Sequence, residues 1–558
     1  MYTNFSPFRP PANFWAKSYK AIAQLIVNGL IKSLIVISSY YWIKNLSAQI
    51  RQGQEIATQN VIYLLLAAGC IVLLRVHERY VAEKMSQKYI NSIRSSLLKR
   101  LMRASIRDIQ TKTIGNLSSR LAGDLSVLKR WLSLGISRLV THSILLSITI
   151  MLVMSINTSL GIVIAVALVV LISAAMAVGH QLKHSIKQVR EKRIKIHSLL
   201  VERLSALPMI RTMGKEQQEV AKINLVANKL EDNIAKQGIF LGLLRGIGDS
   251  SALVLISLFF IFNGYNDNFL STDEITALIS IILFINSPIR ELGRVQEYYQ
   301  GAKLSINKIQ ELYNMPRIIR GKSRQEKVAR ISNALGKISI RNVQILPVFS
   351  ALNMSAKQGE HIALTGSNGS GKSTLLNLLL GLIKADKGKI RVNGIYPNKT
   401  ISSDRARNIG YSSAEALLIK GSLKKNLCYR KPDADKKEIN GLLRFCQLEQ
   451  LVGKLPRGLN TQVNEHGQNF SSGEKARISL FRALLGNPAI LILDEPESYL
   501  DEGGFLIIKQ LLKSYNGTLI VATHNQQLIS LCSKQWNLDK LIKKPNKSMR
   551  LIKNHAKK

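Results

Sequence analysis

The sequence predicts an α-helical transmembrane bundle, followed by an α/β domain. Six apolar segments precede residue 300, a glycine-rich motif lies between a strand-like and a helix-like apolar run, and a later apolar run ends in two carboxylates. About 20 apolar residues cross a hydrocarbon layer of about 30 Å. Apolar runs before such motifs are typical of central strands in a parallel sheet. We expect a transmembrane domain over 1–316, a linker over 317–337 and the α/β domain over 338–558.

The composition fits a membrane protein with basic cytoplasmic surfaces. Lys and Arg total 78 against 35 acidic residues, a formal charge of +43, yet 46% of the residues are hydrophobic. Such charge suggests nucleic acid or a membrane surface as a partner. No basic-aromatic binding motif occurs, so we expect no nucleic-acid binding. The 4 cysteines form no C-x-x-C pair, which argues against a disulfide framework or zinc site and fits a reducing cytoplasm.

The apolar segments are expected to be membrane-spanning helices. Buried core helices are the alternative, but the number, length and basic flanks of the segments favour a membrane. No removable signal peptide is expected. The segments run over Ala21–Ile43, Ala57–Val76, Leu139–Ile156, Leu160–Val178, Leu241–Phe262 and Ile275–Ile289.

Charge between the segments predicts their orientation. The stretches between segments two and three and between four and five are rich in Lys and Arg, whereas Asn263–Glu274 has acidic residues and no basic one. Basic loops stay in the cytoplasm, so both termini and both long loops are expected there. The loops show helical periodicity, which predicts long cytoplasmic extensions of the helices. We expect their turns at Ile114–Asn116 and Leu207–Met209, where they can press on the second domain.

Ionisable residues inside the apolar segments are candidates for a substrate cavity. Charges at membrane depth usually face a water-filled cavity or a partner. The candidates are Lys32, Arg245 and Asp249. Alternatively, Arg245 and Asp249 pair on one helix face, since they are four residues apart. Pro288 is expected to kink the sixth helix.

The second half contains a phosphate-binding loop pattern, G-x-x-x-x-G-K-[ST]. It follows the strand-like run His361–Thr365 and precedes the helix-like run Leu375–Leu380, and this context argues against an ordinary glycine-rich turn. Backbone N–H groups of such a loop bind phosphate oxygens, its lysine reaches the β- and γ-phosphates, and its hydroxyl binds Mg²⁺. The predicted ATP-binding residues are Gly366, Ser367, Asn368, Gly369, Ser370, Gly371, Lys372, Ser373 and Thr374.

Two further strand ends carry candidate catalytic groups. The run Ala489–Asp494 is followed by Glu495; the first carboxylate can position Mg²⁺, together with Ser373, and the second can orient and deprotonate the attacking water. His524 ends the apolar run that begins at Leu519. A histidine at the carboxyl end of a strand beside a nucleotide site is expected to contact the γ-phosphate.

Together these motifs resemble an ATP-binding cassette exporter half-transporter, in which six membrane helices precede one nucleotide-binding domain with a helical signature subdomain. Phe470–Glu474 is similar to the family signature L-S-G-G-Q, and Thr461–Gly467 to the exporter loop T-E-V-G-E-R-G. Ser498–Asp501 resembles the S-A-L-D loop, and Asp124 fits a pattern of the family's first cytoplasmic loop.

The resemblance implies a dimer that clamps ATP between one chain's phosphate loop and the other's signature. Ser471 and Gly473 would then offer N–H and hydroxyl donors to the γ-phosphate. Three positions depart from the family pattern: Ser472 replaces a glycine, Glu474 replaces glutamine, and Ala414 stands where a glutamine is expected. Phe349 is the candidate for stacking on adenine.

The resemblance favours an ATP hydrolase that exports a peptide, lipid or hydrophobic small molecule across the bacterial plasma membrane, with ATP and Mg²⁺ as cofactors. A second half-transporter is the expected partner, an identical copy before a different chain. The alternatives are a membrane-anchored ATPase that gates without pumping, the weaker half of a heterodimer, and a soluble nucleotide-dependent DNA protein.

Overall fold

The computed structural model describes residues 12–265, 270–316, 336–398, 407–413, 417–498 and 501–541. The chain divides into two compact units. The membrane unit comprises residues up to Met102 and Thr111–Met315, and the nucleotide-binding unit comprises Arg103–Gln110 and the residues from Pro316 onward. Most of the predicted linker lies outside the described residues, as do Ala414 and the end of the S-A-L-D-like loop before Asp501.

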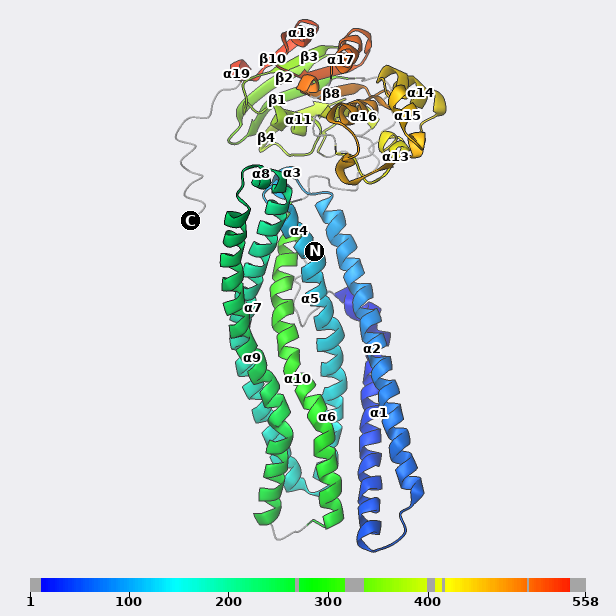
Figure 1. Ribbon diagram of the computed structural model, residues 1–558, viewed down its shortest axis with the longest axis vertical. Coiled ribbons are helices and arrows are strands. Elements are labelled where there is room, and N and C mark those ends of the chain that lie inside the picture. The colour runs from blue at the N-terminus through cyan, green and yellow to red at the C-terminus, as the bar shows by residue number, and fades with distance from the viewer. Residues whose placement is uncertain are drawn as a thin grey trace. The chain divides into compact units, whose positions relative to one another are not determined.

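The membrane unit consists of long helices connected by short turns (Figure 1). Within the described ranges, six helices are long and apolar enough to cross a membrane, as the sequence predicts. One span runs without a break from α4 to α6, with the π-helical turn η1 between α4 and α5 and the π-helical turn η2 between α5 and α6. The elements are α1 (Ala12–Arg51), α2 (Thr58–Leu101), α4 (Ile114–Ser119), η1 (Arg120–Asp124), α5 (Leu125–Arg130), η2 (Trp131–Ile136), α6 (Ser137–Ile156), α7 (Thr158–Ser205), α8 (Leu207–Thr212), α9 (Glu216–Tyr265) and α10 (Thr272–Tyr313).

Local sequence fixes where two of these helices begin. The Asn157 side chain accepts a hydrogen bond from the Leu160 N–H at 3.0 Å and so caps α7. At α10, Ser271 and Glu274 form a reciprocal capping box. Pro288 lies inside α10, which continues through it. The apolar core at the membrane-spanning level comes from α1, α6, α7, α9 and α10.

The nucleotide-binding unit is built on a parallel sheet in the order β10-β3-β9-β8-β5. An antiparallel sheet, β2-β1-β4, packs with α11 on one face of it, and helices α13–α17 pack on the other. The central strands are β3 (His361–Thr365), β5 (Ile409–Ser413), β8 (Ile490–Asp494), β9 (Thr518–Ala522) and β10 (Lys534–Asn537), and the antiparallel strands are β1 (Ile338–Ile345), β2 (Phe349–Ala356) and β4 (Lys387–Val392).

Strand β8 shows why the sheet is central. Ile490 and Ile492 face the cluster around α11, whereas Leu491 and Leu493 face the helices on the opposite side. Successive strand residues point to opposite faces, so a strand covered on both sides is apolar throughout. The polar residue Asp494 therefore appears only where the strand ends.

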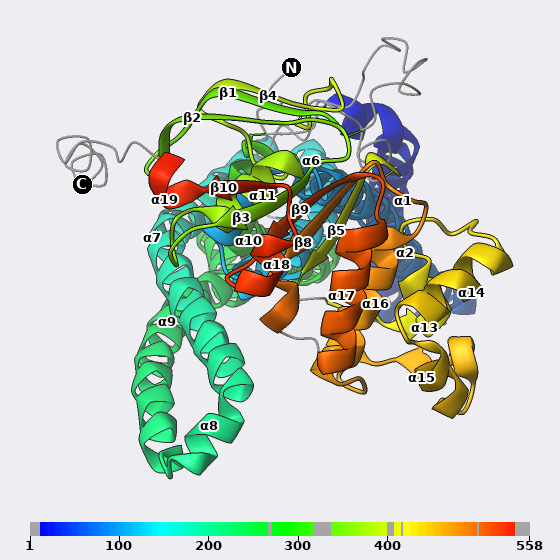
Figure 2. The ribbon, with the colours of Figure 1, turned by 90° about the horizontal axis from the view of Figure 1, so that it is seen from above.

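The remaining elements form the helical side of this unit, where α13, α14 and α15 lie beyond α16 (Figure 2). They are α11 (Lys372–Leu379), β6 (Gly421–Ser422), α13 (Leu423–Leu427), α14 (Lys436–Phe445), α15 (Glu449–Lys454), η3 (Gly458–Asn460), β7 (Gln462–Val463), η4 (Glu465–Gly467), α16 (Ser472–Leu484), η5 (Pro496–Ser498), α17 (Glu502–Ser514), α18 (Gln526–Ser530) and α19 (Leu538–Leu541).

The first of the two turns expected in the cytoplasm differs from the prediction. The expected turn at Ile114–Asn116 is wrong, because Thr113 caps a helix there: its hydroxyl oxygen accepts a hydrogen bond from the Asn116 N–H. The turn lies instead around α3 (Ile106–Gln110), which belongs to the nucleotide-binding unit. The Ile106 N–H donates to the Leu382 carbonyl at 3.2 Å, and Arg107 Nη2 donates to the Leu346 carbonyl at 3.0 Å. The second reversal runs through the short helix α8 between α7 and α9, so the predicted Leu207–Met209 is helical and the turns lie beside it, at Ala206 and at Met213 and Gly214.

Candidate nucleotide site

The predicted phosphate loop connects β3 to α11 and has the backbone of an anion-binding loop. Gly366, Gly369 and Gly371 have φ values of +151°, +82° and +100°, a region that side chains other than glycine rarely adopt. A Cβ at Gly371 would also lie 2.7 Å from the Phe349 ring. The glycines at these positions therefore let the loop curl over the N-terminus of α11, where N–H groups and the helix dipole favour an anion.

Lys372 and His524 meet at the centre of this loop. Lys372 is 7% exposed, and its Nζ donates to the Gly366 carbonyl at 2.9 Å. The same Nζ lies 2.6 Å from His524 Nε2, which accepts if the imidazole carries its proton on Nδ1. Within the described ranges, no carboxylate pairs with this buried ammonium. Because burial of an unpaired charge is costly, the arrangement fits an anionic ligand.

The hydroxyl of Ser370 supports the same assignment. Its Oγ is buried and has no hydrogen-bond partner among the described residues. A buried hydroxyl without a partner costs free energy that a phosphate oxygen in the loop would offset. Lys372, Ser370 and the loop N–H groups therefore form a donor set suited to a polyphosphate.

The two predicted carboxylates lie at the end of β8. Asp494 Oδ2 accepts a hydrogen bond from the Tyr411 hydroxyl at 3.3 Å. Glu495 has a φ of +47°, and its N–H donates to the Ala522 carbonyl at 2.8 Å. A positive φ in a residue other than glycine is strained and is found preferentially at functional sites. The Ser373 hydroxyl and the Asp494 carboxylate are oxygen donors of the kind that Mg²⁺ prefers.

Glu497 was not singled out from the sequence, and it orients the strand end that carries His524. Its Oε1 accepts hydrogen bonds from the Thr523 hydroxyl and, at 3.1 Å, from the His524 N–H. Its Oε2 is buried and unpaired within the described residues. A third acid near Asp494 and Glu495 is visible in the sequence, but nothing there indicates that its partners are the two residues directly after β9.

The signature-like segment begins α16, with Ser471 as its N-cap. The Ser471 Oγ accepts from the Glu474 N–H at 3.2 Å, and Glu474 Oε2 accepts from the Ser471 N–H at 2.7 Å. The expectation that Ser471 offers its N–H to a phosphate is therefore not met in this structure, because Glu474 takes that donor. The Ser471 hydroxyl hydrogen is still available, since its oxygen is the acceptor in the cap.

Asp501 lies at the start of α17 and is fixed by a neighbouring guanidinium. Its two carboxylate oxygens accept from Arg477 Nη2 at 2.6 and 2.7 Å, and Oδ1 also accepts from the Gly504 N–H. The hydrogen bonds from Arg477, and secondarily from Gly504, lower the pKa of the Asp501 carboxyl. This contact joins the S-A-L-D-like loop to α16, which carries the signature.

Phe349 is not placed to stack on adenine. It is 1% exposed and belongs to the core cluster with β1 and α11, and its ring packs against Gly371. A fully buried ring has no free face for a nucleotide base. The prediction for this residue is wrong because the shortened segment before β2 places the aromatic ring in the core.

The three cavity candidates in the membrane unit have different surroundings. Lys32 is 5% exposed and forms an ion pair with Glu78, whose other oxygen accepts from the Thr141 hydroxyl. Asp249 lies 3.4 Å from Arg290 on α10, so the alternative that it pairs with Arg245 is wrong. Arg245 is exposed and makes no hydrogen bond or ion pair within the described part of the chain.

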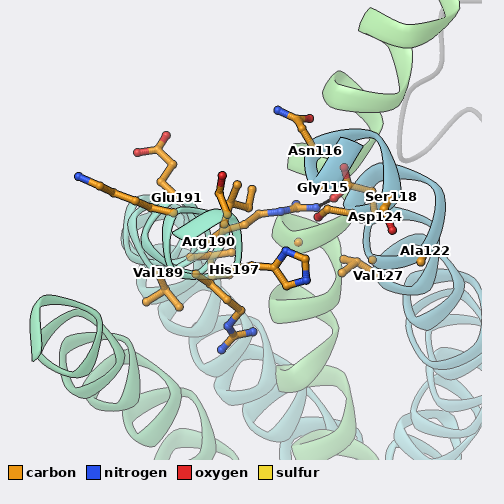
Figure 3. Close-up of a pocket in the computed structure, with 18 of the residues that line it drawn as sticks. Gly115, Asn116, Ser118, Ala122, Asp124, Val127, Val189, Arg190, Glu191 and His197 are labelled. Carbon is orange, nitrogen blue, oxygen red and sulfur yellow. Dashed lines mark ion pairs between the residues drawn. The ribbon is translucent and has the colours of Figure 1, made fainter. Parts of the chain in front are cut away.

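A cavity of about 860 Å³ lies in the membrane unit between η1, α5, α7 and α10 (Figure 3). Arg190 reaches across it to form an ion pair with Asp124, and Arg190 Nη1 also donates to the Ser305 hydroxyl at 3.0 Å. The His197 ring points into the cavity, whereas Glu191 points away (Figure 3). Asp124, which the sequence matched to a loop pattern, therefore connects η1 to α7.

Two family models match the chain. The model of the ABC transporter transmembrane region matches residues 20–289, and the ABC transporter model matches residues 349–498. The phosphate loop and the strand end with Asp494 and Glu495 lie in the second range, whereas His524 lies beyond it.

Curated relatives resemble the chain at low identity. The uncharacterized ABC transporter ATP-binding protein YknU of Bacillus subtilis is 25% identical over 473 residues, which cover 80% of this chain and 77% of the relative. A multidrug efflux ATP-binding/permease protein of Mycobacterium bovis is 24% identical over 488 residues, which cover 86% of this chain but only 40% of that protein.

A solved structure has the same fold. The structure of a bacterial Atm1-family ABC exporter with ATP bound superposes with a TM-score of 0.81, covers 97% of both chains and is 18% identical in sequence. At this identity the likeness establishes the arrangement of helices and strands, which agrees with the predicted membrane bundle and α/β domain.

Proposed function

Because this chain belongs to the ABC transporters and is an exporter half-transporter with six membrane helices and one nucleotide-binding domain, we propose that two copies of it couple ATP hydrolysis to export from a bacterial cytoplasm. The observation that carries the proposal is the convergence of buried Lys372 with His524 at the glycine-rich loop. We propose a multi-pass plasma-membrane protein with both termini in the cytoplasm.

The residues of the site have separate roles in this proposal. Lys372 and the loop N–H groups bind the β- and γ-phosphates, and His524 moves from Lys372 to the γ-phosphate. Ser373 and Asp494 would hold Mg²⁺, which supplies charge neutralisation at the phosphates. Glu495 orients and deprotonates the attacking water.

The chain contributes one phosphate loop and one signature, so a complete site requires a partner. We propose that the partner is a second copy and that its Ser471 hydroxyl and Gly473 N–H close on the γ-phosphate. Closure and reopening of the pair would move the helices that end at α3 and α8, and alternating access would follow. Full retention of Asp494, Glu495 and His524 favours an active site over the gating-only or weaker-half alternatives.

The test uses the full chain in lipid vesicles. Glu495→Gln is expected to lower ATP turnover on the order of 100-fold or more while nucleotide binding persists, because the base is lost and the phosphate contacts remain. The same variant should abolish substrate accumulation in inverted vesicles. Equal turnover by the wild type and the variant would contradict the proposal, and turnover without any transport would favour the gating alternative.

We also propose that the exported substrate carries negative charge, with Arg245 as the contact residue. Arg245 lies about 30 Å along α9 from its Tyr265 end, at about 1.5 Å per residue, which places it near the cytoplasmic side of the membrane. An arginine at this depth that has no partner among the described residues of its own chain requires water, a partner or an anion. Lys32 is a weaker candidate, because Glu78 neutralises it.

The charge proposal is tested by ATPase stimulation across paired anionic and neutral apolar compounds. Arg245→Gln should remove stimulation by the anionic members only. The control is Lys236→Gln, an exposed cation nearer the cytoplasmic end of the same helix. Unchanged transport and stimulation in Arg245→Gln would rule out this role.

A further inference from the structure

We propose that Asp539, in the last described helix, is a positioning residue for ATP binding that holds the first turn of the phosphate loop. The inference rests on the proposed function of that loop. It adds a residue outside every motif named for the site, in α19, which directly follows β10.

Both oxygens of the Asp539 carboxylate bind one residue of the loop. Oδ2 accepts a hydrogen bond from the Ser367 N–H at 2.7 Å, and Oδ1 accepts from the Ser367 hydroxyl at 2.8 Å. Hydrogen bonds to an ionised carboxylate are shorter and stronger than neutral ones. Two of them on a single residue fix both its peptide plane and its side chain.

Asp539 is itself held in place by the element before it. Asn537 Oδ1 accepts from the Asp539 N–H at 3.0 Å and from the Lys540 N–H at 3.3 Å, so it caps the short helix α19. Asn537 is also aligned with Thr365, the last residue of β3, in the parallel pairing of β10 with β3. The position of the Asp539 carboxylate is therefore fixed relative to β3, the strand that leads into the phosphate loop.

The adjoining side chains complete the contact. Leu538 is fully buried, and a Cβ at Gly366 would lie 3.2 Å from the Leu538 Cβ. Gln535 Nε2 donates to the Thr365 hydroxyl at 2.9 Å. Thr365 at the end of β3 and the first two loop positions, Gly366 and Ser367, thus contact residues 535–539, which come 170 or more positions later.

The contact between Asp539 and Ser367 is expected to affect nucleotide affinity because it fixes the backbone at the start of the phosphate loop. The Asp539 carboxylate takes both the N–H and the hydroxyl hydrogen of Ser367, so this predicted ATP-binding residue donates to Asp539 in this structure and the first turn of the loop is held in one conformation. The loop is then ordered before ATP arrives, and preorganisation of a binding loop raises affinity by lowering the ordering cost. Loss of the carboxylate should weaken ATP binding more than it slows hydrolysis.

The experiment compares four full-length variants in lipid: Asp539→Asn, Asp539→Glu, Ser367→Ala and the double variant Ser367→Ala/Asp539→Asn. Asp539→Asn should raise the KM for ATP and the Kd for a fluorescent ATP analogue by about 5-fold to 10-fold, with kcat within about 2-fold of the wild type. Asp539→Glu should recover part of the affinity. The double variant should be no weaker than the worse single variant, because both changes break the same contact.

The matched control is Asp433→Asn, which removes an exposed acid of the same unit that accepts no hydrogen bond within the described residues. Thermal unfolding of Asp539→Asn should equal that of this control. The proposal is overturned if the affinities of the two variants agree, if the single effects add fully, or if kcat alone falls. Failure of the exporter proposal is distinguishable, because wild-type protein would then lack ATP-driven transport while the analogue binding still tests Asp539.

Discussion

The two units of the chain differ in whether their buried charged side chains form ion pairs. In the membrane unit, Lys32 pairs with Glu78, Asp124 with Arg190, and Arg120 with Glu311. In the nucleotide-binding unit, the buried ammonium of Lys372 meets only a carbonyl and an imidazole within the described residues. Paired burial is compatible with a purely structural role, whereas an unpaired buried cation indicates where a ligand of opposite charge binds.

The largest effect is expected from removal of the unpaired charge of Lys372. Lys372→Ala should lower ATP turnover on the order of 100-fold or more, because a charge-stabilising contact to the transferred phosphoryl group is lost. Folding stability should change little, since no buried carboxylate among the described residues loses a counter-charge. Turnover and thermal unfolding of the reconstituted chain measure both, with the exposed Lys384→Ala as control. A native turnover rate would show that Lys372 is not a phosphate ligand.

The opposite result is expected for a paired charge. Glu78→Gln leaves Lys32 buried without a counter-charge and should cost about 3–5 kcal/mol of stability. The double variant Lys32→Met/Glu78→Leu should recover most of it, because an apolar pair of similar size replaces the ions. The unfolding midpoints of the wild type and both variants are compared in one detergent and lipid mixture. If Glu78→Gln is as stable as the wild type, the ion pair between Lys32 and Glu78 does not stabilise the membrane unit.

A smaller effect is expected at the signature. Glu474→Ala removes one half of the capping box at Ser471 and should cost about 0.5–2 kcal/mol, whereas Glu474→Gln keeps the acceptor and should cost less. Thermal unfolding of the two variants gives the difference. Equal losses would mean that the negative charge of Glu474, and not its hydrogen bond, stabilises α16.

The smallest expected effect is the response of Asp501 to acid. Its pKa is lowered by Arg477 from an ordinary value of 3.8, so the contact stabilises the fold above that value. This contribution should be lost as the pH falls below 3.8 through the lower folded-state pKa. Arg477→Met should flatten the stability curve in that range only. A curve that keeps its slope would assign the acid response to other carboxylates.

The membrane bundle and the α/β domain were predictable because their signals are local. Apolar length identified the helices, and the strand-loop-helix context identified the phosphate loop around Gly366 and Lys372. The turn at α3 was misplaced because the helical periodicity continues on both sides of it, and only the cap at Thr113 distinguishes where α4 begins. The roles given to Ser373, Glu495 and Gly473 stay predictions.

Contacts between distant positions could not be predicted. Glu497 bonds to Thr523 across 26 positions, and Asp539 bonds to Ser367 across 172. Asp249 pairs with Arg290 on another helix, although Arg245 lies one turn away on its own helix. In each case the choice of partner depends on how strands or helices pack, which residue spacing does not encode. The burial of Phe349 against Gly371 likewise depends on how β2 packs against the phosphate loop.

The assignment of α3 to the nucleotide-binding unit has a practical consequence for studies of that unit in isolation. A fragment cut at the linker lacks residues 103–110, and with them the donors that Leu382 and Leu346 use. Its surface would therefore differ from that of the same unit in the intact chain. Supplying a synthetic peptide of this segment should restore the missing surface, and ATP turnover measured with and without the peptide would show how much the excised unit depends on it.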